Sequence, residues 1–496
     1  MHTVYEMKRL EHLAIIAHDM GTIFGFLGVI TLLPFVVMII YREWDMIVPM
    51  ATVPLSFVIL GLVISKVPRK EHVPQLSVAL AAVALTWLVS AVIGSFPFIV
   101  GLGMSPTDSI FEAMSGWTDT GITMMTSIDT APKTLLFWRS MMQWIGGIGV
   151  ISFGIAMASR SSLAQYRLYR SEGRSEALMP SVVSTGRRMW VIYLGLTLSF
   201  TLLIMLSGVS LWDAINLTMT AIATGGFTPH DAGILFYDNA LLEYLLIPAM
   251  LCGSFPFKIY FFMYRGAFRH IFRDQTIKVI LLLSLLGSFM VILNLHLFGD
   301  VAIRTALREG LFMGASAATS TGFQNSSVNM WPVISIIVVT LLMLIGGASG
   351  STAGGLKVNR IILAYEGLIW WFKRFFVRGN VIVPFKHDGR TYPKKISELE
   401  LSKNMVIIVL YVLMVFLAVI FSLHAAGMML PTEFVVFDIV SAIGNNGLGA
   451  GFIGPSSPIA IKWEFILLMW IGRLEILPVL ILFLGIFRGF DIRIPR

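Results

Sequence analysis

Charge is what this sequence has least of. Only 13% of its 496 residues are Asp, Glu, Lys or Arg, whereas 56% are hydrophobic and the mean hydropathy is +0.82. A soluble protein would carry about a quarter charged residues. Uncharged runs such as 405–423 approach the roughly 20 apolar residues that a membrane-spanning helix needs. The composition therefore predicts an all-α polytopic membrane protein.

Cysteine and clustered histidine are also scarce. The single Cys252 excludes an intramolecular disulfide and a multi-cysteine metal site, and its place beside Gly253 favours a packing role. The nine histidines are scattered, which argues against a membrane enzyme with a nucleophile and its base. The net charge of +8 comes from basic residues in short loops and does not indicate nucleic-acid binding. We expect no organic cofactor.

Glycine organises what is present. Four glycines stand in matching contexts: an apolar residue follows each, and a small hydroxyl residue stands six positions before it. These glycines are Gly121, Gly226, Gly322 and Gly447. Thirteen or fourteen positions before each glycine stands an acid: Asp108, Asp213, Glu309 and Glu433. Their recurrence predicts four copies of one structural unit.

Each unit is expected to contain a first helix, a short helix, the glycine loop and a second helix. Two lone helices, near 20–41 and 49–66, come first. The first helices are expected near 76–100, 189–207, 277–298 and 405–424, and the second near 134–158, 241–264, 332–362 (interrupted) and 462–487. The domains are then 1–74 for the lone helices and 75–160, 161–275, 276–375 and 376–496 for the four repeats.

Loop charge predicts the orientation of these ten crossings. With both termini on one side, that side holds 28 of the 36 Lys and Arg residues, a bias typical of the cytoplasmic side. The four repeats are then parallel and can surround one axis along the membrane normal. Asp108, Asp213 and Glu309 are expected at the start of their short helices, where they would complement the helix dipole, and the negative helix ends would point toward the axis.

A ring of such loops suits a cation. Glycine permits the sharp return of the chain, and backbone carbonyls can replace the hydration shell of an ion. The carbonyls in question belong to Thr120, Gly225, Thr321 and Asn446. The alternative interpretation is that the four glycines only allow helices to pack closely.

The motifs at 118–123, 225–228, 320–323 and 444–447 resemble those of the Trk/Ktr/HKT superfamily of potassium transporters. The resemblance extends from about residue 76 to the C-terminus, and the two extra helices resemble the TrkH branch. It implies four helix–pore-loop–helix units around one pore, usually in a homodimer. It also implies K⁺ uptake across the inner membrane of a prokaryote, and a cytoplasmic nucleotide-binding regulator of the TrkA type.

The resemblance also implies a selectivity filter. Its residues would be Asp119, Thr120, Gly121, Thr224, Gly225, Gly226, Ser320, Thr321, Gly322, Asn445, Asn446 and Gly447. A glycine in the first loop is similar to the potassium-preferring members. Asp119 departs from the pattern, because this branch more often has a small or hydroxyl residue there. Its carboxylate would be either an acceptor behind the filter or a charge at the mouth.

The second helices carry another set of glycines, 24 to 27 residues beyond the first set: Gly146, Gly253, Gly346 and Gly472. In the third unit a run of five glycines in ten residues predicts a broken helix. A phosphate-binding loop is excluded because the lysine comes one place late and no hydroxyl follows it. The resemblance implies an intramembrane gate formed by Gly346, Gly347, Gly350, Gly354, Gly355, Lys357 and Arg473.

Arg473 is the charge that most needs an explanation, because a guanidinium at membrane depth is costly. We expect it to face the pore beneath the filter and to bind carbonyls of the gate. The alternatives are a local pair with Glu475 or snorkelling. The basic segment 357–403 is expected to meet lipid headgroups or a partner protein. A sodium- or proton-coupled carrier of K⁺ or Na⁺ remains the alternative function.

Overall fold

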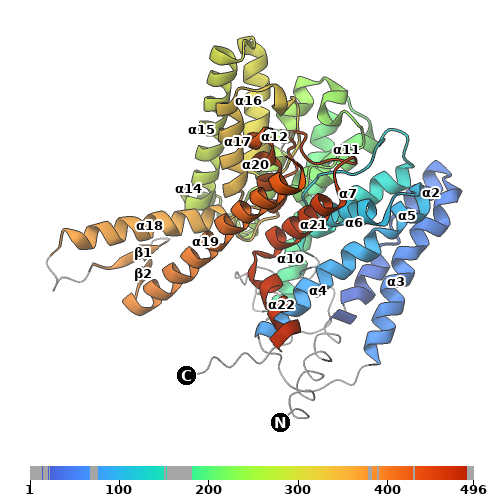
Figure 1. Cartoon of the computed structure of the whole chain (residues 1–496), viewed down its shortest axis with the longest axis horizontal. Helices are drawn as coiled ribbons and strands as arrows, with labels where there is room; N and C mark the ends of the chain where they lie inside the picture. Colours follow the sequence, from blue (N-terminus) through green and yellow to red (C-terminus); the bar gives the residue numbers. More distant parts are fainter. Residues whose placement is uncertain are drawn as a thin grey trace.

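A computed structural model describes residues 14, 20–21, 23–66, 76–149, 152, 181–377, 383–387, 390–427 and 431–488. Almost all of the regular structure in this part of the chain is helical (Figure 1), so the all-α prediction is confirmed. The sheet found among these residues is one small antiparallel hairpin, β1 (Phe385–His387) with β2 (Arg390–Tyr392).

The two lone helices pack on the first unit. The first runs over Ile23–Tyr41 and ends with α2 (Pro34–Tyr41); the second is η1 (Trp44–Met46) followed by α3 (Ile47–Ser65). Between them, the carboxylate of Glu43 accepts hydrogen bonds from the backbone N–H groups of Lys133 and Thr134, both at 2.8 Å. An acid at free N–H groups stabilises a helix start, so Glu43 caps the second helix of the first unit.

The four first helices lie where the sequence predicted them. They are α4 (Leu76–Gly94) with its continuation α5 (Phe96–Leu102), α10 (Val182–Met205), α15 (Gln275–Phe298) and α19 (Lys394–Ala425). Helix α19 begins eleven residues earlier than expected. Its extra turns carry the polar sequence that precedes the apolar run, and they belong to an arm that projects to the left of the body in Figure 1.

The arm consists of α18 (Val358–Phe375), the β1–β2 hairpin and the start of α19 (Figure 1). Trp370 joins its parts: the indole N–H donates to the carbonyl of Val383 at 2.8 Å, and the ring packs edge-on against Phe385. His387 lies 2.6 Å from the carboxylate of Glu366 on α18. The hairpin is therefore fixed to α18 at two places.

The short helices are α6 (Pro106–Trp117), α11 (Leu211–Ala223), α16 (Ile303–Ala318) and α20 (Thr432–Ile443). Ser105 and Ser210 cap the first two, accepting from the N–H groups of Asp108 and Asp213, as in a capping box. The expectation for Glu309 was wrong. Helix α16 begins six residues before it, so Glu309 lies within the helix and accepts a hydrogen bond from Ser326 at 2.7 Å.

The second helices are more broken than the sequence predicted. They are α7 (Lys133–Ile148), α12 (Ala240–Ser254) with α13 (Phe257–Tyr264), α17 (Val333–Ile345), and α21 (Ile459–Leu474) with α22 (Leu477–Arg488). Helices α12 and α13 meet at 97°, and α21 and α22 at 112°. An extended Phe255 before Pro256 ends α12, and left-handed Glu475 and Ile476 end α21.

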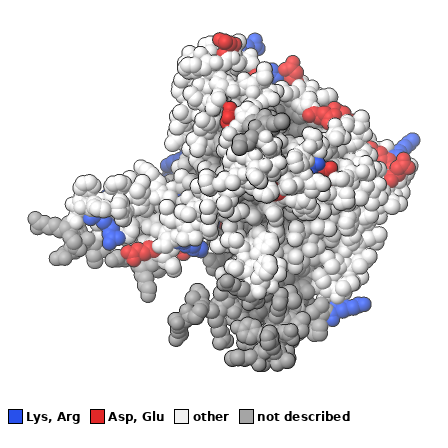
Figure 2. Space-filling model, viewed as in Figure 1, with Lys and Arg blue, Asp and Glu red and all other residues white. Residues whose placement is uncertain are grey.

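Six helices among the described residues are long and apolar enough to cross a membrane, or up to eight if each bent pair is one span. The other two expected crossings begin with α7 and α17, which are shorter, so ten crossings stays a prediction. Most of the face in Figure 2 carries neither acidic nor basic residues. Large apolar side chains are exposed on the surface of the protein, among them Leu282, Leu285 and Phe289. This surface is typical of a protein whose solvent is lipid.

Candidate functional site

The four glycine loops follow the four short helices and share one backbone conformation. The residue two places before each glycine has a positive φ: 55° at Asp119, 59° at Thr224, 57° at Ser320 and 48° at Asn445. The glycines themselves have φ of 87°, 77°, 83° and 102°, in the order Gly121, Gly226, Gly322 and Gly447. Two residues with positive φ, separated by one residue, therefore recur in all four loops.

Each short helix ends in a Schellman motif. The N–H one place before the glycine donates to the carbonyl six places before it, at 2.8–2.9 Å in all four loops. The N–H group two places before the glycine donates to the carbonyl five places before the glycine, at 3.1–3.2 Å. In this motif the residue just beyond the helix, two places before the loop glycine, is left-handed, and glycine is the usual residue there. None of the four loops has glycine there; Asp119 and Asn445 are residue types that tolerate the conformation.

The loops abut one another in a closed ring. A Cβ atom added to any of the four glycines would overlap a carbonyl oxygen of the next unit. The contacts join Gly121 to Gly225, Gly226 to Thr321, Gly322 to Asn446 and Gly447 to Thr120. The four carbonyls singled out from the sequence are the four in these contacts. The glycines lie in loops, so close packing between helices is not their role.

Side-chain amides brace the ring. Gln143, on α7, donates to the carbonyl of Gly225 at 2.6 Å and accepts from the N–H of Phe227 at 3.0 Å. The amide of Asn445 donates to the hydroxyl of Thr120 at 3.0 Å. Sequence reasoning missed Gln143, because it belongs to the second helix of one unit and supports the loop of the next.

Two buried acids were also missed. Glu112 and Asp438 stand nine residues before their glycines, and each accepts the N–H group three residues after that glycine: Met124 at 2.7 Å and Ala450 at 2.6 Å. Glu112 also pairs with Arg139 at 2.7 Å, and both side chains are buried. The shared spacing was visible in the sequence, but only in the first and fourth units.

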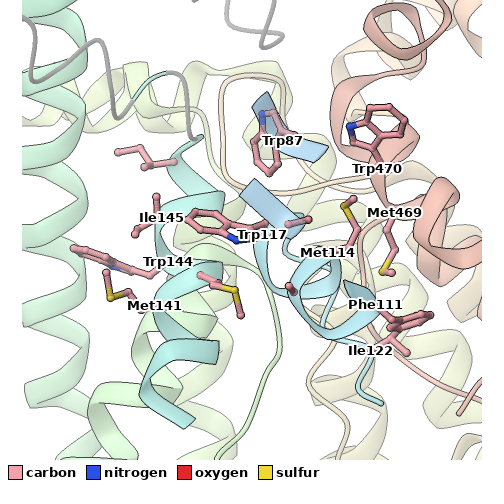
Figure 3. Close-up of a cluster of buried hydrophobic side chains, with 14 of the residues drawn as sticks. Trp87, Phe111, Met114, Trp117, Ile122, Met141, Trp144, Ile145, Met469 and Trp470 are labelled. Carbon is pink, nitrogen blue, oxygen red and sulfur yellow. The ribbon is translucent and has the colours of Figure 1, made fainter. Parts of the chain in front are cut away.

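The glycines of the second helices make room for the short helices. A Cβ at Gly146, Gly253 or Gly472 would overlap a carbonyl in the last turn of the short helix of its own unit. These carbonyls belong to Trp117, Ile222 and Ile443, each four residues before the loop glycine. Figure 3 shows the packing around Trp117, with Trp87, Met114 and Ile145 close by. Gly346 differs, because it lies against the carbonyl of Gly354.

The run after α17 forms an irregular segment, residues 346–357, which we call the gate loop. Gly346, Gly350, Gly355 and Lys357 have φ between 70° and 81°, which prevents a continuous helix. Gly347 and Gly354 also lack space for a side chain, while Gly350 has open space around it. The ammonium group of Lys357 donates to the carbonyl of Ala353 within the loop.

Thr352 attaches the gate loop to the second unit. Its hydroxyl lies 2.9 Å from the carbonyl of Ile222 and 2.8 Å from that of Gly253. It also accepts from the hydroxyl of Thr224 at 3.2 Å. Because Ile222 is in the last turn of α11 and Thr224 is in the glycine loop, the gate loop packs directly against the base of the ring.

Arg473 attaches the gate loop to the first unit. One guanidinium nitrogen donates to the carbonyl of Thr352 at 2.8 Å. The other donates to the carbonyls of Gly146 and Gly147 and lies 3.1 Å from a carboxylate oxygen of Asp119. Glu475, the local partner that the sequence allowed, pairs with Arg360. The arginine thus contacts the gate loop, α7 and the first glycine loop together.

The loops before α7 and α12 are joined by charges. His230 lies 2.7 Å from Asp129 and 3.4 Å from Asp213, and Phe236 stacks on its ring. The hydrogen bond from His230 is the main cause that lowers the pKa of the Asp129 carboxyl from its ordinary value. Asp231 accepts the N–H of Ile128 at 2.5 Å. These contacts tie the first unit to the second.

Together these features define a polytopic helical membrane protein in which four glycine loops form a ring that contacts the irregular segment 346–357. The chain belongs to the TrkH family of cation transport proteins, whose model matches residues 55–487. It is therefore a transport protein rather than an enzyme, and the family expected from the sequence motifs is confirmed.

Similar proteins are also described as cation or potassium transporters. A cation transporter of Methanocaldococcus jannaschii, described as uncharacterized, is 33% identical over 472 residues, 94% of each chain. The Trk system potassium uptake protein TrkH of Halomonas elongata is 31% identical over 414 residues, 81% of this chain and 83% of its own. The crystal structure of the potassium transporter TrkH from Vibrio parahaemolyticus matches with a TM-score of 0.84 and 25% identity, covering 96% of this chain and 99% of that one.

Proposed function

We propose that this protein takes up K⁺ through a selectivity filter made of its four glycine loops. The observation that carries the proposal is the closed ring, in which each glycine abuts the carbonyl of the next unit. Several relatives of the chain are named potassium uptake proteins. Carbonyl oxygens held at such a ring can replace the water around a dehydrated K⁺ ion.

The filter proposed from the sequence is retained. K⁺ would meet the carbonyls of Thr120, Gly225, Thr321 and Asn446, with the neighbouring residues of each loop shaping the site. A carbonyl ring selects an ion by cavity size and by the number of dipoles it offers. The amide bonds of Gln143 and Asn445 would keep those dipoles in place.

The gate loop would close the path at the base of the filter. Its attachment through Thr352 and Arg473 holds it against the first and second glycine loops. The guanidinium of Arg473 would supply part of this attachment through its hydrogen bonds to backbone carbonyls. Opening would require the loop to leave these partners, and the cytoplasmic regulator of the TrkA type would supply that force.

The remaining architecture is proposed as follows. The units are 75–160, 161–275, 276–375 and 376–496, parallel around the pore, after the two helices of 1–74. Both termini and the arm would be on the cytoplasmic side of a prokaryotic inner membrane, in agreement with the distribution of Lys and Arg. The protein would act as a homodimer, with the regulator bound on its cytoplasmic loops.

The test is uptake of radioactive rubidium into liposomes that contain the purified protein, with K⁺ or Na⁺ as competitor. We expect K⁺ to block uptake far better than Na⁺, and Gly121→Ser to weaken that preference. Equal competition by both ions would contradict a potassium filter. Uptake that requires a sodium or proton gradient would instead favour the coupled carrier. No uptake, even after Arg473→Gln, would contradict the channel-like proposal.

A further inference from the structure

Two ion pairs connect the first unit to α21, one near each end of the contact between α6 and α21. Near the start of both helices, Lys462 lies 2.6 Å from Asp108. Eleven residues after each member of this pair, Arg473 lies 3.1 Å from Asp119. The spacing corresponds to about three helical turns, so both pairs follow the same helix–helix contact.

The two pairs have different surroundings. Lys462 bonds to Asp108 and to the carbonyl of Pro455, in the loop before α21. Arg473 bonds to Asp119 and to Thr352 of the gate loop. Only the second pair therefore bridges a glycine loop and the gate loop.

Asp119 is buried and is suited to this role. Its side chain is 1% exposed, and no hydrogen bond to either carboxylate oxygen is found within the described structure, so Arg473 at 3.1 Å is its closest charged partner. A buried carboxylate without a counter-charge is costly. The carboxylate of Asp119 would therefore depend on the guanidinium of Arg473 as its counter-charge.

The remaining loops offer no second charge of this kind. The residues at the same position of the other three loops are Thr224, Ser320 and Asn445, which are neutral. Lys357, in the gate loop, is also basic, and its ammonium group bonds to the carbonyl of Ala353. The ring therefore carries one acid at its base, on the side of Arg473.

We propose that Asp119 is a positioning residue, the counter-ion that holds Arg473 between the first glycine loop and the gate loop and cancels its charge in the ion path. The proposal rests on the proposed function, because it assigns the charge balance of that pore. It places Asp119 at the base of the filter and not at the mouth. The gate then closes by hydrogen bonds around a neutral pair, without an uncompensated positive charge.

The consequence is a specific pattern of transport kinetics. In Asp119→Asn, the guanidinium keeps its charge without a counter-ion and repels the permeating cation. In Arg473→Gln, the carboxylate keeps its charge, and the permeating cation becomes its nearest counter-ion. The first change should lower the maximal rate. The second should raise the maximal rate and lower the half-saturating cation concentration. Asparagine suits the left-handed conformation of residue 119, so the first variant keeps the loop backbone.

The experiment measures rubidium uptake against rubidium concentration for the wild type, Asp119→Asn, Arg473→Gln and the double variant. We expect Asp119→Asn to reduce the maximal rate about tenfold, which corresponds to about 1.4 kcal/mol of barrier height. We expect Arg473→Gln to raise the maximal rate and lower the half-saturating concentration about tenfold, as a 1.4 kcal/mol gain in cation binding would. In the double variant both effects should disappear.

Asp108→Asn is the matched control, because it removes the same charge from the other ion pair on α21. It should leave the half-saturating concentration and the effect of Arg473→Gln unchanged. The inference is overturned if Asp119→Asn has the same kinetics as Asp108→Asn. It is also overturned if Asp119→Asn lowers the rate by the same factor with and without Arg473.

A thermal-unfolding cycle separates this inference from the proposed function. Wild-type protein that transports no rubidium would contradict the function, yet the pair would still be tested by the Tm values of the same four proteins in detergent. A double variant whose Tm is no lower than that of either single variant supports a coupled pair. Additive losses of Tm would overturn it.

Discussion

Gly447 in the last glycine loop lies directly against the carbonyl group of Thr120 in the first, 327 residues earlier in the chain. This contact closes the ring, since the other three contacts join successive units. Glycine is required at position 447 for two separate reasons. The residue has a φ of 102°, and its neighbour occupies the space where a side chain would begin.

Gly447→Ala should therefore destabilise the filter and abolish selective uptake. The positive φ alone costs about 1–3 kcal/mol for a residue with a Cβ, and the overlap with Thr120 adds to that cost. Tm in detergent and the K⁺/Na⁺ competition ratio are the measurements. Gly449→Ala is the control, because nothing lies within 4 Å of its added Cβ. Equal behaviour of the two variants would contradict the ring.

Gly253→Ala should lower Tm, because its Cβ would overlap the carbonyl of Ile222 at the end of α11. Overpacking of this kind costs about 1–3 kcal/mol. Gly195→Ala, on α10, provides the opposite expectation: its Cβ has open space, and alanine favours a helix interior by about 1 kcal/mol. A loss of Tm in the second variant, or none in the first, would show that the packing is different.

Gln143→Ala should weaken discrimination between K⁺ and Na⁺ more than it weakens folding. The change leaves the carbonyl of Gly225 and the N–H of Phe227 without their bonds, at a cost of about 1–3 kcal/mol for the buried groups. Competition in the rubidium assay measures the effect. Ser140→Ala removes a hydroxyl that bonds within its own helix and should leave selectivity unchanged.

Thr352→Val should raise rubidium uptake in the absence of any regulator. Valine keeps the shape of threonine but loses the hydroxyl contacts with Ile222, Gly253 and Thr224, so the gate loop would leave the ring more easily. Ser351→Ala is the control, since that hydroxyl bonds to Ala348 within the loop. Uptake that is unchanged in Thr352→Val would argue against this anchor.

The sequence predicted the parts of the site that repeat. The four matched glycines form the ring, and the hydroxyl residue six places before each supplies the Schellman carbonyl. Three of the four second-helix glycines pack against the short helix of their own unit. The residues that make these contacts recur once in each unit, so their spacing is visible without a structure.

Contacts between units could not be predicted in this way. Gln143 braces a loop that is 82 residues away, and Asp119 meets an arginine from the last unit. The breaks after α12 and α21 were missed because Pro256 and Ile476 lie within runs of high hydropathy that read as continuous helices. Glu309 was assigned to a helix start because its spacing matched, although α16 has an extra turn.

Helix α18 begins at Val358, the residue that follows the gate loop, and runs for 18 residues into the arm. At about 1.5 Å per residue it is a rod roughly 27 Å long, rigidly joined to its hairpin by Trp370. Helix α18 therefore connects the arm directly to the gate loop. A displacement of the arm would be transmitted along α18 to the gate loop and to the contacts that Thr352 and Arg473 make with it.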